Sequence, residues 1–148
     1  SLIGMALRLV MAANQAIALL ARLGAPLLLR DERAAAAFDP DQVQAAAYFS
    51  LRLFNQGFNI GLVFFGVDCL VIGWLIFRST FLPRILGVLL ALAGLSYLIN
   101  SFADFVFPAF DFPFDILTPA YIAELALAIW LVVMGVNAEK WKMQAAGQ

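Results

Sequence analysis

Residues Phe54–Phe77 read FNQGFNIGLVFFGVDCLVIGWLIF, an apolar run in which Asp68 is the only charged residue. A helix needs about 20 such residues to cross the hydrocarbon layer of a membrane. The run lacks the alternation of polar and apolar residues that a strand of a membrane barrel requires. The stretch therefore predicts a transmembrane helix and indicates an integral membrane protein.

The composition of the whole chain favours the same class. Of the 148 residues, 64% are hydrophobic and 13% are charged, and the mean hydropathy is +0.93. A water-soluble domain carries about 25% charged residues, so this chain has too few charges to cover a soluble surface. The net charge of −1 argues against nucleic-acid binding, which needs a basic face. The chain has no histidine and one cysteine, which excludes histidine catalysis, histidine-ligated zinc and an internal disulfide.

Three further apolar runs accompany the first one. We expect a single all-α domain over residues 1–148, a polytopic transmembrane helical bundle with four membrane-spanning helices. The expected spans are residues 2–29, 54–77, 85–106 and 117–137, followed by a short tail over residues 138–148. Since the first run begins without a basic flank, we also expect further helices upstream of Ser1.

Basic residues in the short loops predict the orientation. Arg78 and Arg84 flank the turn between the second and third spans, and Lys140 and Lys142 follow the fourth. Short loops rich in Lys and Arg lie on the cytoplasmic side of a membrane. We therefore expect both chain ends in the cytoplasm.

The helix of the second span has a start signal well upstream of the span. Asp39 can cap a helix, Pro40 suits the first helical position, and Asp41 adds a favourable charge to the first turn. A helix from Pro40 to Phe77 would be roughly 57 Å long, which exceeds the hydrocarbon thickness of about 30 Å. Either its first part extends beyond the membrane, or the helix bends near residues 55–57 and lies in the interface.

The loop over residues 107–115 reads FPAFDFPFD, in which four aromatic residues alternate with prolines and acids. Proline prevents a regular helix there. The loop is either an aromatic belt at the outer membrane surface or a cap folded over a cavity between the helices.

Small residues predict where the helices pack closely, because membrane helices associate through close contact of their backbones. Gly57 and Gly61 form a GxxxG pair, and Gly87, Ala91 and Gly94 form a stripe in the next span. We interpret both sets as helix-packing seams rather than gating hinges.

Polar side chains inside the spans are expected to face protein or water, because a charge at the bilayer centre costs about 2.5–3.5 kcal/mol. Arg8, Gln15 and Arg22 are seven residues apart and share one helical face. Depth along the helices predicts a polar cluster in the outer half of the membrane, comprising Arg22, Asn59, Tyr97, Asn100, Asp104 and Glu124. This cluster is either a network that determines which helices pack together or a proton or solute pathway.

Asp68 is a titratable residue expected deeper in the membrane, near the level of Gln15. It pairs with the first span, or it is neutral because burial disfavours the charged form, or it meets a partner outside this chain. The neighbouring Cys69 is interpreted as a small buried apolar residue rather than a nucleophile.

Motifs of catalysis are missing from the sequence. There is no phosphate-binding glycine loop, no zinc-protease motif and no nucleophile elbow. We expect no enzymatic activity, and therefore no catalytic residues, no cofactor and no metal site.

Residues Gly61–Phe102 match a long and specific pattern, GLVFFGxxCLxxGxLIFRSxFLPRILGxLLxxAGxxYLIxSF. In this pattern the chain resembles the bacterial integral-membrane family called domain of unknown function 4386. The segment Ile122–Asn137, IAELALAIWLVVMGVN, is similar to the closing helix of that family, including the position of Glu124. Family members usually have two further membrane helices and an extracytoplasmic loop upstream, and more often histidine at the position of Asp68. The resemblance implies a six-helix bacterial inner-membrane protein and supplies no activity.

We expect a structural or interaction protein, such as an accessory subunit of a larger membrane assembly. Its partners would be the lipid bilayer and other membrane subunits or further copies of itself, and not nucleic acid. The alternative is a small proton-linked or solute permease that uses Arg22, Asp68 and Glu124. A subunit would bury Asp68 or the glycine seams against another chain, whereas a permease would line a water-accessible cavity with those three residues.

Overall fold

The computed structural model describes residues 2–107 and 115–147 of the chain. The loop with the alternating aromatic residues falls on residues 107–115, almost all of which lie outside the described ranges. Both interpretations of that loop therefore stay predictions.

The described part of the chain is helical and contains no strand. This confirms the expected all-α helical bundle. The helices are α1 (Leu2–Arg30), α2 (Glu32–Ala37), α3 (Pro40–Arg78), α4 (Arg84–Val106), α5 (Thr118–Val133) and α6 (Ala138–Ala146).

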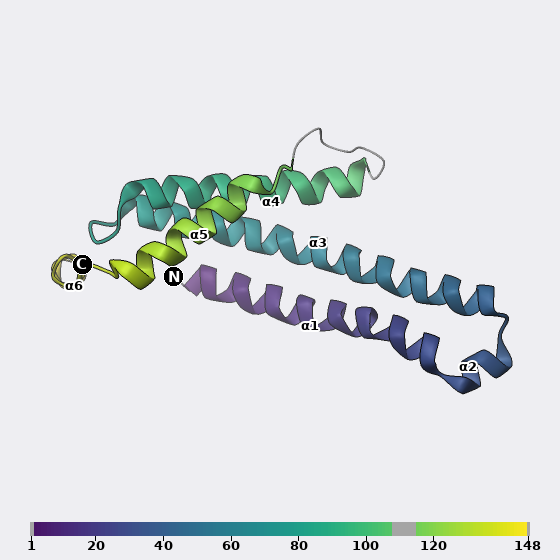
Figure 1. Cartoon of the computed structure of the whole chain (residues 1–148). Helices are drawn as coiled ribbons and strands as arrows, with labels where there is room; N and C mark the ends of the chain where they lie inside the picture. Colours follow the sequence, from purple (N-terminus) through teal and green to yellow (C-terminus); the bar gives the residue numbers. More distant parts are fainter. Residues whose placement is uncertain (1, 108–114, 148) are drawn as a thin grey trace.

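The four long helices follow one another in a row rather than in a closed ring (Figure 1). α1 packs on α3, α3 on α4 and α4 on α5, and neither α4 nor α5 packs against α1. The apolar core lies where α3, α4 and α5 meet, and it includes Leu62, Leu90, Tyr97 and Ala123. The outer faces of α1 and α5 carry exposed apolar side chains such as Leu20. Such faces suit contact with lipid or with further membrane helices.

The helix α3 is continuous over 39 residues, which corresponds to about 58 Å. Its start at Pro40 agrees with the capping signal, because the side-chain oxygen of Gln42 accepts a hydrogen bond from the N–H of Asp39 at 3.3 Å. The helix runs through residues 55–57 without interruption. Two alternatives were open for this helix, a continuous extension and a bend near residues 55–57. The structure shows the continuous extension.

The hairpin of α1 and α3, closed by the short α2, is longer than the other helices. Figure 1 shows it extending past the end of α4. Since Asp104 contacts Gln56 and Asn59, the last turn of α4 lies level with the middle of α3. The first half of α3 and the second half of α1 therefore form an extension that α4 and α5 do not cover.

By length and composition, α1, α3 and α4 are each able to cross a membrane. α5 has 16 residues and extends about 24 Å, less than a hydrocarbon layer of about 30 Å. It counts as a fourth span only together with α6, from which it is bent by 99°. α5 ends before the expected limit at residue 137 because Gly135 has a φ of 65°, a conformation that commonly stops helices.

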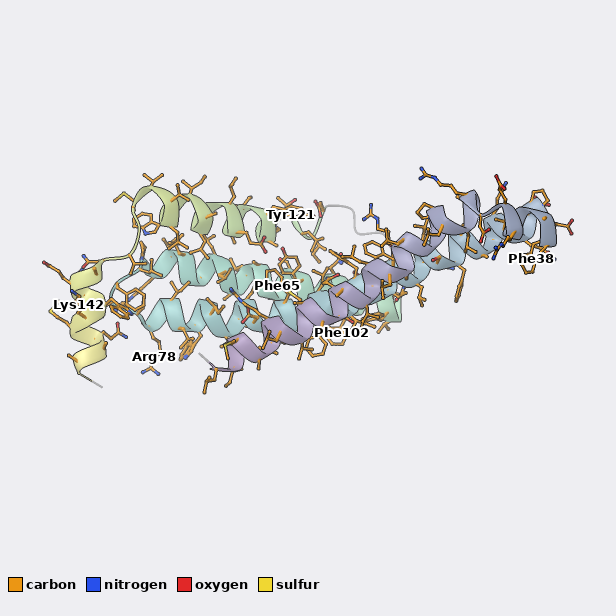
Figure 2. All side chains as sticks on the ribbon, turned by 90° about the horizontal axis from the view of Figure 1, so that it is seen from below. Phe38, Phe65, Arg78, Phe102, Tyr121 and Lys142 are labelled. Carbon is orange, nitrogen blue, oxygen red and sulfur yellow. The ribbon has the colours of Figure 1, made fainter. Side chains whose placement is uncertain are left out.

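The segment expected to be a short tail contains the helix α6. The side chain of Asn137 caps it by accepting a hydrogen bond from the N–H of Lys140 at 3.0 Å. The side-chain oxygen of Gln144 accepts from the N–H and the hydroxyl of Thr80, at 3.0 and 2.9 Å, and so holds α6 on the turn between α3 and α4. Figure 2 shows Arg78 and Lys142 at one end of the molecule and Phe38 at the other.

Candidate functional site: polar pairs between the helices

The contact between α3 and α4 is built from glycines. A Cβ atom on Gly73 would lie 2.7 Å from the carbonyl oxygen of Gly87, and one on Gly94 would lie 2.5 Å from that of Gly66. The backbone of Ala91 is also within 2.9 Å of the Gly73 position. Any side chain at these glycines would separate the two helices. The close contact at this seam therefore fixes how α3 and α4 lie against each other, and with that the positions of the neighbouring polar side chains.

The contact between α1 and α3 combines glycines with polar side chains. A Cβ atom on Gly57 would lie 2.9 Å from the Cβ of Ala18, and one on Gly61 would lie 2.7 Å from the side-chain amide of Gln15. The amide of Asn14 donates a hydrogen bond to the carbonyl oxygen of Gly57 at 2.6 Å. The polar face of α1 is therefore partly used inside the molecule, against α3.

Asp68 and Arg8 form the ion pair of this contact. The Nε of Arg8 donates to Oδ2 of Asp68 at 2.7 Å, and this is the ion pair recorded among the described residues. The Asp68 side chain is 1% exposed and that of Arg8 is 62% exposed. Of the three alternatives for Asp68, the structure therefore shows the first, in which Asp68 pairs with a residue of the first expected span, here α1.

Each member of this pair keeps unused hydrogen-bonding capacity. The Oδ1 atom of Asp68 is buried and has no hydrogen-bond partner in the described chain. The guanidinium of Arg8 lines an open groove of about 530 Å³ together with the apolar Met5, Leu9 and Ile72. The groove therefore presents a cation on an otherwise apolar surface.

A second polar pair joins α4 to α5. The hydroxyl of Tyr97 donates to Oε1 of Glu124 at 2.6 Å. The Tyr97 ring packs against Phe65 of α3, with a distance of 5.2 Å between ring centroids. Figure 2 shows Phe65 within the row of helices, well away from either end of the molecule.

A third polar group lies near the last turn of α4. The Oδ2 atom of Asp104 accepts hydrogen bonds from the side-chain amides of Asn59 at 2.6 Å and Gln56 at 3.4 Å. These residues line a polar pocket of about 290 Å³, together with Arg52, Asn55 and Phe58. Asn100 is half-buried on α4 between the levels of Asp104 and Tyr97.

The residues predicted as one cluster therefore occupy separate places. Asn59 contacts Asp104, whereas Tyr97 contacts Glu124. On α4, Tyr97 precedes Asp104 by seven residues, which corresponds to about 10 Å. The guanidinium of Arg22 lies 5.1 Å from the centre of the Phe54 ring, near the level where α4 ends. An ion pair between Arg22 and Glu124 is not among those in the described residues. The separation of Arg22 from Glu124 does not follow from the depth of each residue within its own span, because the α1–α3 hairpin continues past the end of α4.

No group of three or more metal-ligating His, Cys, Asp or Glu side chains occurs within residues 2–107 and 115–147. The polar contacts instead join neighbouring helices in groups of two or three residues.

Comparison with known proteins places this arrangement in a family. The family model described as "Domain of unknown function (DUF4386)" matches residues 1–135. The chain belongs to the DUF4386 family. An uncharacterized protein of Archaeoglobus fulgidus is 28% identical to this DUF4386 chain over 85 residues, which cover 57% of the chain. The match spans half the length of that relative. No solved structure matches the chain.

Sequence reasoning missed several residues that contribute to the contacts of this DUF4386 chain. Gly66 and Gly73 are seven residues apart, as are Gly87 and Gly94, so the equal spacing of the two pairs was a signal for their meeting across α3 and α4. Gln56 was missed as a partner of Asp104, because one amide among several in a span carries no signal of its own. Ser101 was outside the predicted cluster, yet its hydroxyl is buried without a hydrogen-bond partner in the described chain.

Proposed function

We propose that this DUF4386 chain is a structural or interaction subunit of a larger membrane assembly, without catalytic chemistry. In this proposal, it lies in the inner membrane of a bacterial cell with its chain ends in the cytoplasm. The observation that carries the proposal is the exposed guanidinium of Arg8, held by Asp68 in the apolar groove of α1.

The depth of this pair makes the exposure costly in lipid. Asp68 lies ten residues before Arg78, the end of α3, which places it about 15 Å inside a hydrocarbon layer of about 30 Å. An arginine near the bilayer centre usually extends its side chain toward the headgroups. The hydrogen bond to Asp68 prevents this for Arg8, because it holds the guanidinium at the level of the carboxylate.

The chemistry of the groove indicates what covers it. Arg8 uses its Nε in the contact with Asp68, and an arginine has five N–H donors in total. A lipid chain would leave the remaining donors without acceptors, whereas a membrane helix with a carboxylate, amide or backbone carbonyl would satisfy them. The open row of helices supports this proposal, because among the described helices α1 packs on α3 and α2 only, which leaves its outer face available to further helices.

Cysteine crosslinking in native membranes tests the proposal. In a Cys69→Ala background, Ala12→Cys places a thiol beside the groove, and Ile99→Cys places one on the outer face of α4. We expect a short bifunctional thiol reagent to join the Ala12→Cys chain to another membrane chain and the Ile99→Cys chain much less. Equal, low crosslinking at both positions, with a monomer in native mass spectrometry from lipid nanodiscs, would contradict the proposal.

A second function, a proton-linked or solute permease, is favoured by two carboxyl groups between the helices, because Asp68 is buried and Glu124 is half-buried. Among the residues that the structure describes, Asp68 has Arg8 and Glu124 has Tyr97 as its one recorded hydrogen-bond partner. If this alternative holds, Glu124→Gln in proteoliposomes changes the rate at which a pH gradient decays and leaves the helical content unchanged. A rate equal to that of the unchanged protein would count against it.

A further inference from the structure

The polar pocket at the end of α4 has features that the subunit proposal does not use. Arg52, Asn55, Gln56 and Asn59 lie on one face of α3, at spacings of three or four residues, and Asp104 reaches them from α4. The glycine seam ends before this point, so the helices are joined here by side chains instead of backbone contact. The volume of about 290 Å³ is at the lower end of the range for small-molecule pockets, about 300–1,000 Å³.

Asp104 has hydrogen bonds but no counter-charge in the described chain. Its partners Asn59 and Gln56 donate through neutral amides, and no cationic side chain among the described residues forms an ion pair with it. The two amides orient the carboxylate and leave its charge uncompensated. A carboxylate of this kind favours a cationic ligand with N–H donors, such as a primary ammonium.

Arg52 supplies the opposite charge at the other end of the pocket. It lies one helical turn beyond Gln56, and its guanidinium lies 6.0 Å from the centre of the Tyr48 ring, with no carboxylate partner among the described residues. The separation of residues 52 and 59 along α3 is about 10 Å. The pocket therefore presents the Asp104 carboxylate at one end and the exposed side chain of Arg52 at the other, with the apolar ring of Phe58 on its wall.

We propose that this pocket binds a small zwitterion in which a primary ammonium and a carboxylate are separated by a methylene chain, the chemistry of an ω-amino acid. The ammonium binds Asp104, the carboxylate binds Arg52 and Asn55, and the methylene chain packs against Phe58. From the separation of about 10 Å between positions 52 and 59 we infer that an α-amino acid, which carries its ammonium and carboxylate on the same carbon, is too short to contact both residues.

The order of the charges favours a dissolved ligand over a lipid headgroup. Asp104 lies on the membrane side of the pocket and Arg52 lies further out along the hairpin, away from α4. In phosphatidylethanolamine, the phosphate is the group nearer to the acyl chains and the ammonium is the outer group. A lipid would therefore bring each charge to the wrong end, whereas a solute entering from water can place its ammonium inward.

Thermal unfolding of the full chain in detergent, with and without added ligand, tests this pocket. The probes are glycine, γ-aminobutyrate and ε-aminocaproate, with hexylamine and hexanoate as probes that carry one charge. We expect one of the two longer zwitterions to raise the melting temperature and glycine and the single-charge probes to do so weakly. Asp104→Asn and Arg52→Gln should each weaken the apparent affinity roughly tenfold or more, since each removes a hydrogen bond to a charged group.

Matched variants change the same charges at the same end of the molecule but outside the pocket. Asp41→Asn in the first turn of α3 and Arg33→Gln in α2 should leave the affinity unchanged. Arg52 is exposed, so Arg52→Gln is expected to fold even if Asp104→Asn does not. The proposal is overturned if glycine binds as well as the longer probes, if binding is insensitive to Arg52→Gln, or if native mass spectrometry finds that phosphatidylethanolamine binds and none of the zwitterions does.

Discussion

At the scale of single residues, Asp68 forms an ion pair with Arg8 at a depth where the membrane supplies no water. One of its oxygens accepts from Arg8, and the other is buried without a partner in the described chain. A buried carboxylate with one partner is sensitive to the loss of that partner, because no solvent can replace the hydrogen bond. Arg8 and Asp68 therefore hold α1 at one position along α3.

Removing the guanidinium of Arg8 is predicted to destabilise the fold more than removing that of Arg22. Arg8→Met leaves Asp68 without its counter-charge, and the free energy of unfolding should fall by about 3 kcal/mol. This is the lower end of the range for a broken buried pair, and it suits the exposed side chain of Arg8. Unfolding in mixed micelles, followed by circular dichroism, measures the change.

Two further variants check that the loss comes from the pair. Adding Asp68→Asn to Arg8→Met removes the uncompensated charge and should restore part of the stability. Arg22→Met breaks a contact with the Phe54 ring and should cost about 1 kcal/mol or less. Equal losses in Arg8→Met and Arg22→Met would show that Asp68 does not depend on Arg8.

At the scale of the elements, the seam between α3 and α4 depends on the absence of side chains. The atoms nearest to Gly73 are the carbonyl oxygen of Gly87 and the backbone of Ala91, and neither can move without moving α4. Close backbone approach is one source of attraction between membrane helices, which have little hydrophobic drive to associate.

Adding one methyl group to this seam is therefore predicted to weaken it. Gly73→Ala should lower the free energy of unfolding by about 1–3 kcal/mol, the usual cost of overpacking. Gly147→Ala is the matched control, because its Cβ would meet nothing closer than 3.6 Å, and it should stay within about 0.5 kcal/mol. Thermal unfolding in detergent compares the two, and an unchanged melting temperature for Gly73→Ala would contradict the close packing of the seam.

At the scale of the whole molecule, the α1–α3 hairpin is the feature that departs from a simple bundle. It continues past the end of α4, so a membrane that matches α4 leaves the far end of the hairpin outside the hydrocarbon (Figure 1). Phe38 lies at that end and Arg78 at the other (Figure 2).

Labelling with a membrane-impermeant maleimide tests this placement in vesicles that contain the purified chain alone. In a Cys69→Ala background, Tyr48→Cys should react because it lies in the extension, whereas Leu95→Cys should not because it lies within α4. Both side chains are exposed on the protein, so burial inside the protein does not distinguish them. If Tyr48→Cys does not react with the maleimide, the extension lies in the membrane and the placement is wrong.

The helices were more predictable than the contacts between them. The start of α3 at Pro40 and the limits of α4 follow from caps, prolines and apolar length, which act within a few residues of the chain. The early end of α5 was missed, although a glycine at the position of Gly135 is a common signal for the end of a helix. The grouping of Arg22 with Glu124 failed for another reason, since depth in a membrane depends on how the helices are staggered.

The amino-acid sequence by itself determined that this chain forms long apolar helices with few charges inside them, because hydrophobicity and helix signals are local properties. It also carried the pattern of the DUF4386 family. Only the tertiary structure decided the order α1–α3–α4–α5, and with it the partners of the polar residues. That order depends on which faces meet and how far each helix slides along its neighbour, so Arg8 meets Asp68 while Arg22 lies far from Glu124.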